Sequence, residues 1–344
     1  MAAVVWWLPG PRDAAPSTTR PPLLYVGVDG CVRCHEEETE LWRGSHHDLA
    51  MQEATEATVL GDFEDAEFTY NGVTSRFFRR DGGFFASTDG PDGTLTDYEI
   101  DYVFGFTPLQ QFLIALPDGR YQALGIGWDS RPVEDGGQRW FHLYPGERVD
   151  HRDVLHWTKL SQSWDSQCAE CHSTNLRKNY RPAEDRFATT FSEIDVSCEA
   201  CHGPGSRHVA WAEVAEAGEP APEDPGTGLV VRLKDLDEPY WSFDDTGIAR
   251  RTPARTSHTQ VEACGRCHSR RSVSRDPYHY GEPLLDTHRV SLLEPGLYHP
   301  DGQILEEVYV YGSFLQSRMH REGVTCSDCH DAHSLELVRE GDAL

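Results

Sequence analysis

The sequence predicts an α+β protein in which a scaffold of short helices and loops is interrupted by an inserted β-meander of five to seven strands. Two observations lead to this prediction. One short cysteine and histidine motif occurs five times, without a longer repeat around it. The first two copies are separated by a long stretch in which aromatic or branched residues alternate with polar ones.

The composition is that of a large, acidic protein. The chain has 344 residues, of which 38% are hydrophobic, so it is long enough for one large domain or two smaller ones. Asp and Glu outnumber Lys and Arg by 57 to 31, which gives a formal net charge of −26. Nucleic acid is not expected as a partner, because phosphate binding needs a basic face. No integral membrane span is expected, because no apolar run approaches the roughly 20 residues that such a helix needs.

The N-terminal part is expected to contain a leader and the first motif. Residues 1–22 combine a short apolar stretch with a segment rich in Pro, Ala, Ser and Thr, which indicates an N-terminal leader or linker. Residues 23–60 are expected to form the first motif-bearing segment, with a helix predicted over residues 36–56 that carries His46 and His47.

The β-rich insert is expected to occupy residues 61–145. Turn signals such as Asn71-Gly72 and Asp118-Gly119 separate its apolar runs and are typical of hairpins. The predicted strands cover residues 67–70, 73–79, 84–88, 97–106, 111–116 and 120–128. Residues 146–344 are expected to carry the other four motifs on short helices and loops.

All ten cysteines belong to C-x-x-C-H motifs. The pairs are Cys31 and Cys34, Cys168 and Cys171, Cys198 and Cys201, Cys264 and Cys267, and Cys326 and Cys329. The histidines that follow them are His35, His172, His202, His268 and His330. This motif is the attachment signature of c-type haem, because two thiols one helical turn apart can bond to the porphyrin while the histidine binds the iron as its proximal ligand. The sequence therefore predicts five covalently bound haem c groups per chain.

Two other uses of paired cysteines fit less well. Zinc sites with four cysteines consume C-x-x-C pairs two at a time, so five pairs would leave one over. A dithiol oxidoreductase needs one such pair rather than five. Because haem c is attached on the outer side of the cytoplasmic membrane, the protein is expected to be exported, with a periplasmic or extracellular location.

Twelve histidines lie outside the motifs, and each of the five irons has one further axial position to fill. His208 follows His202 and His333 follows His330 so closely that each is expected to reach the iron of a neighbouring haem rather than its own. His47 is expected to do the same. The other candidates for distal ligands are His320, His156 and His299. Loop or hydrogen-bonding roles are the alternative for His142, His279 and His288.

Methionine ligation is expected to contribute little. Only Met51 and Met319 are internal methionines, and each has histidines nearby that compete with it. Because methionine ligation raises the reduction potential of a haem, the sequence favours a mainly bis-histidine set of low potential.

Three stretches carry a resemblance to a known family, namely Trp42–Met51, Cys198–His208 and Gly323–His333. They resemble exported multihaem c-type cytochromes related to the tetrahaem cytochrome that accepts electrons from hydroxylamine oxidoreductase. Many such proteins carry tetratricopeptide repeats after the haem part. The resemblance implies that His47, His208 and His333 are distal ligands. Similar proteins commonly continue into another haem motif, whereas this chain ends fourteen residues after His330, so both a complete protein and a fragment of a longer one are considered.

Three functions fit these features. The first is an electron-transfer protein that exchanges electrons with other redox proteins, as donor and acceptor, through closely packed haems. The second is a multihaem oxidoreductase that acts on a small nitrogen or sulfur compound at one open haem iron. The third is a filament subunit that self-associates into haem chains. The unaltered form of all five motifs and the surplus of histidines favour the first function, so no catalytic residue is assigned.

Overall fold

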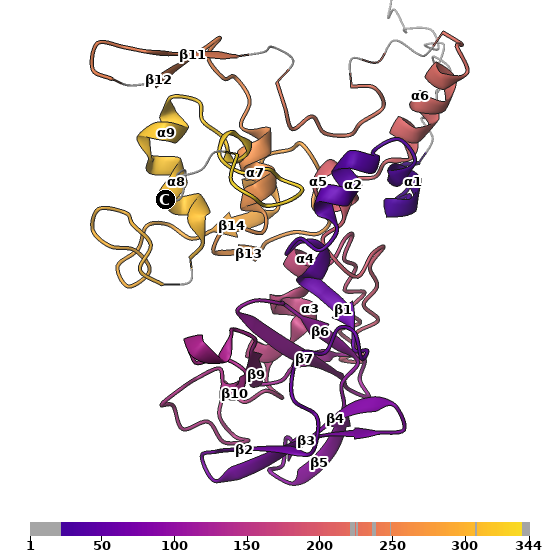
Figure 1. Ribbon diagram of the computed structural model, residues 1–344, viewed down its shortest axis with the longest axis vertical. Helices are drawn as coiled ribbons and strands as arrows, with labels where there is room; N and C mark the ends of the chain where they lie inside the picture. Colours follow the sequence, from indigo (N-terminus) through magenta and orange to yellow (C-terminus); the bar gives the residue numbers. More distant parts are fainter. Residues whose placement is uncertain are drawn as a thin grey trace, which may run out of the picture.

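The computed structural model of the chain has two different parts. Figure 1 shows a lower part built mainly from sheets and an upper part built from short helices and loops. The described residues are 22–220, 224, 226–235, 239–247, 249–306 and 308–338. The predicted leader or linker therefore lies outside the described residues, except for Pro22. Within the described ranges, no helix is both long enough and apolar enough to cross a bilayer.

The first motif joins two short helices, α1 (Val28–Val32) and α2 (Glu36–Trp42). Helix α2 begins with three glutamates, and acidic residues in a first turn interact favourably with the helix dipole. Its last residue, Trp42, is buried and donates its indole N–H to the carbonyl oxygen of Val196 at 3.1 Å. This contact holds the first motif against the segment that precedes the third.

The helix predicted over residues 36–56 is wrong beyond Trp42. The chain leaves the helix at Gly44, whose φ of +73° lies in the region that favours glycine. It then forms a 3₁₀ turn, η1 (Asp48–Ala50), and a strand, β1 (Met51–Glu53). His46 and His47 therefore lie in a turn rather than on a helix.

The insert contains two antiparallel sheets. The first is a four-stranded meander of β2 (Ala66–Tyr70), β3 (Val73–Arg80), β4 (Gly83–Asp89) and β5 (Leu95–Glu99). The second has the order β1-β6-β7-β9-β10, with β8 also paired to β7, and uses β6 (Tyr102–Phe104), β7 (Leu109–Ala115), β8 (Tyr121–Ala123), β9 (Ile126–Asp129) and β10 (Arg139–His142).

The described part of the insert therefore has nine strands rather than five to seven. The predicted run over residues 97–106 divides at Ile100 and Asp101, because the chain passes there from the first sheet to the second. The run over residues 120–128 divides at Leu124 and Gly125, so that β8 and β9 pair with opposite ends of β7. Strand β10 was not predicted.

The two faces of the second sheet are both covered. One face packs against the first sheet around an aromatic cluster in which Phe77 stacks on Trp140 with ring centroids 3.6 Å apart. The other face buries Phe104 and Leu113 against Trp164. Trp164 begins α3 (Trp164–Gln167), which leads directly into α4 (Ala169–His172) and the second motif. The insert thus provides a rigid support for that motif.

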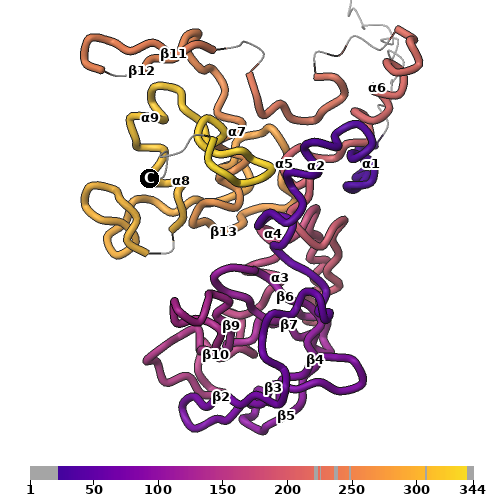
Figure 2. The backbone as a smooth tube through the Cα atoms, in the orientation of Figure 1, coloured from indigo at the N-terminus to yellow at the C-terminus, as the bar shows by residue number. Residues whose placement is uncertain are grey.

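Motifs three to five lie in the upper part, where the chain follows an irregular path between short elements (Figure 2). Its helices are α5 (Cys198–His202), α6 (Ser206–Glu216), α7 (Thr259–Gly265), α8 (Val310–Gln316) and α9 (Arg318–Arg321). Two small hairpins pair β11 (Tyr240–Phe243) with β12 (Ala249–Thr252) and β13 (Arg271–Val273) with β14 (His288–Val290). The remaining 3₁₀ turns are η2 (Val133–Asp135), η3 (Leu160–Gln162), η4 (Leu284–Asp286) and η5 (Cys326–Asp328).

Candidate haem-attachment sites

Each motif forms a compact turn that brings its two cysteines together. In the fourth motif, the amides of Cys267 and His268 both donate to the carbonyl oxygen of Cys264, at 3.1 and 2.9 Å. The fifth motif has the same pattern, and in the third motif helix α5 spans both cysteines and the histidine. A single helical turn of this kind suits two thioether bonds to one porphyrin and places the histidine beside it.

The attachment loops of different motifs touch one another. The side chains of Cys31 and Cys198 interact, and this interaction holds the pKa of the Cys198 thiol below its usual value. The thiol of Cys171 donates to the carbonyl oxygen of Cys267 at 4.0 Å, and the side chains of Cys264 and Cys326 interact in the same way as those of Cys31 and Cys198. Motif one therefore contacts motif three, and motif four contacts motifs two and five. The contacts place motif four at a branch point of the cluster.

Three motif histidines face a second histidine ring. The ring centroids are 6.1 Å apart for His35 and His208, 6.4 Å for His268 and His47, and 6.5 Å for His202 and His333. Two imidazoles on opposite sides of one metal ion, each bound at about 2.0 to 2.1 Å through nitrogen, have ring centroids about 6.4 Å apart. The observed pairs therefore have the spacing that accommodates one iron atom between them.

A turn after the third motif directs His208 away from its own motif. Gly203 follows the last residue of helix α5 with a φ of +70°, and a side chain there would clash with Val230. Only glycine suits both the conformation and the contact. The chain then enters α6, on which the ring of His208 faces His35 rather than His202.

The histidines of motifs two and five have a different environment. The Nδ1 of His172 donates to the carbonyl oxygen of Ala50 at 2.9 Å, and its ring meets the edge of Phe104 at 5.5 Å. Among the described residues, neither His172 nor His330 forms a ring pair with another histidine. An iron bound by His172 would therefore have no second imidazole beside it among the described residues.

His320 lines a cavity and has one ring nitrogen without a partner among the described residues. Its Nδ1 donates to the carbonyl oxygen of Leu315 at 3.1 Å, whereas its buried Nε2 has no hydrogen-bond partner among the described residues. Such a tautomer leaves Nε2 able to bind a metal. The cavity has a volume of about 520 Å³ and is also lined by His258, by four arginines and by Val324, two residues before Cys326.

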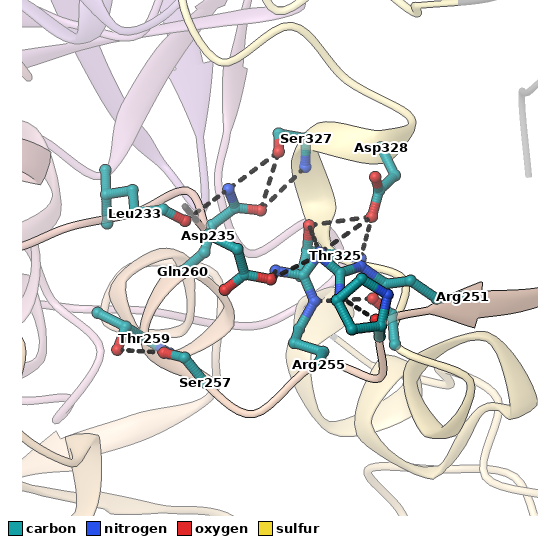
Figure 3. Close-up of polar contacts among 12 residues, drawn as sticks. Leu233, Asp235, Arg251, Arg255, Ser257, Thr259, Gln260, Thr325, Ser327 and Asp328 are labelled. Atoms are coloured by element: carbon teal, nitrogen blue, oxygen red, sulfur yellow. Dashed lines mark hydrogen bonds and ion pairs between the residues drawn. The ribbon is translucent and has the colours of Figure 1, made fainter. Parts of the chain in front are cut away.

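A polar network fixes the fifth motif beside this cavity (Figure 3). Arg255 forms ion pairs with Asp235 at 3.3 Å and with Asp328, inside the motif, at 3.7 Å. The side-chain amide of Gln260, on α7, donates to the hydroxyl of Ser327 at 2.9 Å. Because α7 leads into motif four, these bonds fix motif five relative to motif four.

Two sequence-based distal candidates do not lie beside a motif. His156 is only 4% exposed, and its Nε2 bonds to Asp89 at 3.2 Å while its Nδ1 bonds to Thr158 at 2.9 Å. Both ring nitrogens are occupied, so the expectation that His156 binds iron is corrected. His299 is exposed and forms no ring pair within the described part of the chain.

Two other histidines form hydrogen bonds to neighbouring groups. The Nε2 of His288 bonds to Glu170 at 3.0 Å, and the Nδ1 of His142 accepts a bond from the amide of Tyr144 at 3.1 Å. These bonds are compatible with the alternative role named for both residues in the sequence analysis.

Burial favours the neutral imidazole at four of these histidines, namely His47, His172, His202 and His268. Desolvation, followed by the nearby His268, lowers the pKa of His47 to about 4. Burial also lowers the pKa of His172, His202 and His268. The neutral imidazole is the form that binds a metal, so these histidines suit iron ligation at neutral pH.

The sequence analysis missed several residues that assemble this cluster. Glu199, inside motif three, accepts bonds from the amides of Val26, Gly27 and Gly205 at distances of 2.7 to 3.0 Å. His258 faces His320, with ring centroids 5.4 Å apart. Each of these two histidines lies six residues before the first cysteine of a motif, a spacing that was available in the sequence.

Comparisons with known proteins agree with this arrangement. The family model described as cytochrome c554 and c-prime matches residues 30–68 and 146–203, which hold motifs one to three on either side of the insert. No curated protein matches the chain.

Two solved structures are similar. The outer cell wall cytochrome OcwA has a TM-score of 0.52 and 21% identity, over 92% of this chain and 58% of that one. The undecahaem cytochrome from the S-layer of Carboxydothermus ferrireducens has a TM-score of 0.42 and 16% identity, over 94% of this chain and 42% of that one. The present chain thus spans little more than half the length of OcwA. Its fold is that of a multihaem c-type cytochrome.

Proposed function

We propose that this protein is a pentahaem c-type cytochrome that transfers electrons between redox partners through closely packed, mainly bis-histidine haems. The observation that carries the proposal is the spacing of the three histidine pairs, 6.1 to 6.5 Å between ring centroids. A bound haem supplies an iron that cycles between the ferric and ferrous states. Two imidazoles on that iron leave no position for a substrate, which suits electron transfer.

The proposed ligands cross between motifs. We assign His208 to the haem of motif one, His333 to that of motif three and His47 to that of motif four. Each distal histidine comes from a segment that follows a different motif, so each assignment requires two haems to be neighbours. The thiol contacts between motifs one and three, two and four, and four and five support the same packing.

His320 is assigned to the haem of motif five. Its buried Nε2 is free, and the cavity that it lines extends to Val324, next to this motif. The cavity walls include Arg250, Arg251 and Arg255, which pair with carboxylates of the chain. They also include Arg321, which forms no ion pair among the described residues and suits a haem propionate. His258 shares the cavity and provides a matched comparison for mutagenesis.

The acidic surface supports basic redox proteins as partners. A formal charge of −26 attracts a basic protein over long range. Electron exchange with such a partner should slow as ionic strength rises, because salt shortens the range of attraction. We place the protein outside the cytoplasmic membrane, where haem c is attached.

A second candidate function is favoured by motif two. The ring nearest to His172 is that of Phe104 rather than an imidazole. If this iron keeps an open position, the protein is an oxidoreductase that acts there on a small nitrogen or sulfur compound. The remaining haems would then supply electrons to that site.

Histidine substitutions test the proposed ligation. His47→Ala in the holoprotein should convert one low-spin haem to a high-spin or water-ligated one while all haems stay attached. His46→Ala, which removes the exposed neighbouring imidazole, should leave the spectrum unchanged. An unchanged spectrum for His47→Ala would rule out its assignment.

Carbon monoxide binding and turnover together distinguish the two functions. With four irons bound by two histidines each, only the iron at motif two is expected to bind carbon monoxide rapidly, and an electron-transfer protein should turn over neither nitrite nor hydroxylamine. Rapid binding of one molecule per chain, together with turnover of nitrite or hydroxylamine, would favour the oxidoreductase.

A further inference from the structure

The distal imidazole proposed for motif one is held by a turn that lies further along the chain. The Nδ1 of His208 donates a hydrogen bond to the carbonyl oxygen of Thr227 at 2.8 Å. Because Nδ1 carries the proton, Nε2 is the nitrogen that is left to bind iron. The ring of Trp211, one turn further along α6, lies nearly parallel to that of His208, with an interplanar angle of 11° and centroids 6.2 Å apart. Neither Thr227 nor Trp211 belongs to a motif, yet both flank this ligand.

Thr227 has a strained backbone. Its φ is +50°, in the left-handed region that β-branched residues rarely adopt. Such a conformation costs free energy and persists only where the surrounding structure enforces it. Asp224 contributes to this enforcement, because its carboxylate accepts hydrogen bonds from the amides of Gly226 at 2.8 Å and Gly228 at 3.2 Å. The strain therefore indicates a use for the Thr227 carbonyl.

Gly228 allows this turn to lie directly against helix α6. Its φ is +81°, and an added Cβ atom would clash with the carbonyl group of Arg207 and with the Cα of His208. These are backbone atoms of the helix, which cannot rotate away as a side chain can, so only glycine fits. The close approach brings the Thr227 carbonyl within hydrogen-bonding distance of His208.

The proximal side of the same histidine pair has a related feature. The Nδ1 of His35 lies 3.7 Å from the carboxylate of Glu38. An oxygen atom thus lies near the Nδ1 of both imidazoles, and in His208 it accepts a hydrogen bond. Such partners orient a histidine ligand and increase its basicity. A more basic ligand stabilises ferric over ferrous iron, which lowers the reduction potential of a bound haem.

We propose that Thr227 and Gly228 are positioning residues for the distal ligand of the haem at motif one, here called haem one. They fix the ring of His208 and lower the reduction potential of haem one. The inference rests on the proposed assignment of His208 to this haem. Because the Thr227 carbonyl acts only through the imidazole, loss of its hydrogen bond should raise the potential of haem one while the haem stays low-spin.

Two glycine variants beside α6 test the site. Gly228→Ala should displace the turn from His208. Gly218→Ala, after the other end of α6, is the control, because its φ is a similar +71° but no atom of the described residues lies within 4 Å of an added Cβ. Both substitutions introduce comparable backbone strain, and neither changes the charge.

The measurement is a redox titration of the holoprotein followed by electron paramagnetic resonance. The low-spin signal that is missing from His208→Ala identifies haem one. At a fixed applied potential, the ratio of ferric to ferrous haem one should fall about tenfold in Gly228→Ala, which corresponds to about 59 mV for one electron. Gly218→Ala should titrate as the wild type does. An equal shift in both glycine variants would overturn the positioning role.

Substitutions of Asp224 test the same turn without changing its glycines. Asp224→Ala removes both hydrogen bonds to the amides of the turn, whereas Asp224→Asn removes the charge but keeps one oxygen acceptor. The potential of haem one should rise more in Asp224→Ala than in Asp224→Asn. Equal rises would show an effect of charge alone and would overturn the positioning role.

The outcomes separate this inference from the proposed function. If His208→Ala removes a low-spin signal but Gly228→Ala and Asp224→Ala titrate as the wild type does, the positioning role fails while the ligand assignment stands. If His208→Ala leaves the spectrum unchanged, the ligand assignment and the positioning role both fail. High-spin haem one in both Gly228→Ala and Asp224→Ala would show that the turn is required for ligation itself and would overturn its effect on the potential.

Discussion

The substitution Glu199→Gln should weaken the contact between motifs one and three. Glu199 is 1% exposed and belongs to motif three, yet its carboxylate accepts bonds from the amides of Val26 and Gly27, just before motif one. It accepts a third bond from the amide of Gly205 at 2.7 Å. Among the described residues, no cation pairs with it, so these amides provide its stabilisation.

The expected loss of stability follows from the replacement of one carboxylate oxygen by an NH₂ group. Glutamine has the same shape as glutamate, but its side-chain NH₂ group cannot accept a hydrogen bond. At least one backbone N–H that now donates to a carboxylate oxygen would therefore lose its acceptor. Hydrogen bonds to a charged group contribute about 1.5 to 3 kcal/mol each. We therefore expect local opening of the segment to become easier by about 2 kcal/mol, which speeds amide exchange about 30-fold.

Hydrogen exchange on the ferric holoprotein measures this effect directly at Val26 and Gly27. Glu213→Gln is the control, because Glu213 also joins motif one to the segment after motif three, through Arg33 at 3.0 Å. Both side chains of that pair are about half exposed, 46% and 57%, so its loss should cost under about 1 kcal/mol. Equal exchange rates in the two variants would refute the reasoning.

Three further predictions concern haem content, the insert and pH. Mass spectrometry of the denatured holoprotein should show five covalently attached haems, and a mass without haem would contradict the attachment chemistry. Trp140→Ala should destabilise the insert by about 3 to 5 kcal/mol in denaturant unfolding, because its ring packs on Phe77, while the haem spectrum stays unchanged. Burial, followed by Glu193 and Asp48, raises the pKa of Asp195 to about 7, so the folded state holds this proton more tightly than the unfolded state. The variant Asp195→Asn should therefore have a larger free energy of unfolding than the wild type above pH 7. This difference should shrink as the pH falls from 7 towards 4. A difference that grows on acidification would contradict the raised pKa.

The local parts of the fold could be predicted from the sequence. The turn at Asn71-Gly72 joins β2 to β3 as expected, because both residues have the positive φ that such hairpins require. The C-x-x-C-H motifs similarly fix their own geometry within one turn. In both cases the determining residues are neighbours in the chain.

Features that depend on distant partners were harder to predict. The helix expected over residues 36–56 is interrupted because Met51 pairs with Phe104 in a sheet. Which of the histidines outside the motifs face a motif histidine also depends on contacts between residues that are distant in the sequence. The ring of His47 faces that of His268, which lies far away in the sequence. The Nε2 of His156 instead bonds to Asp89. Neither contact could be predicted from the neighbouring residues in the sequence.

An electron paramagnetic resonance spectrum of the fully oxidised holoprotein tests the central claim most directly. Three histidine pairs at 6.1 to 6.5 Å, with His320 as a fourth distal ligand, predict that low-spin ferric haems account for most of the iron. At most a minor high-spin signal, from the haem beside His172, should accompany them. A spectrum dominated by high-spin haem would contradict the bis-histidine account and the electron-carrier function that rests on it.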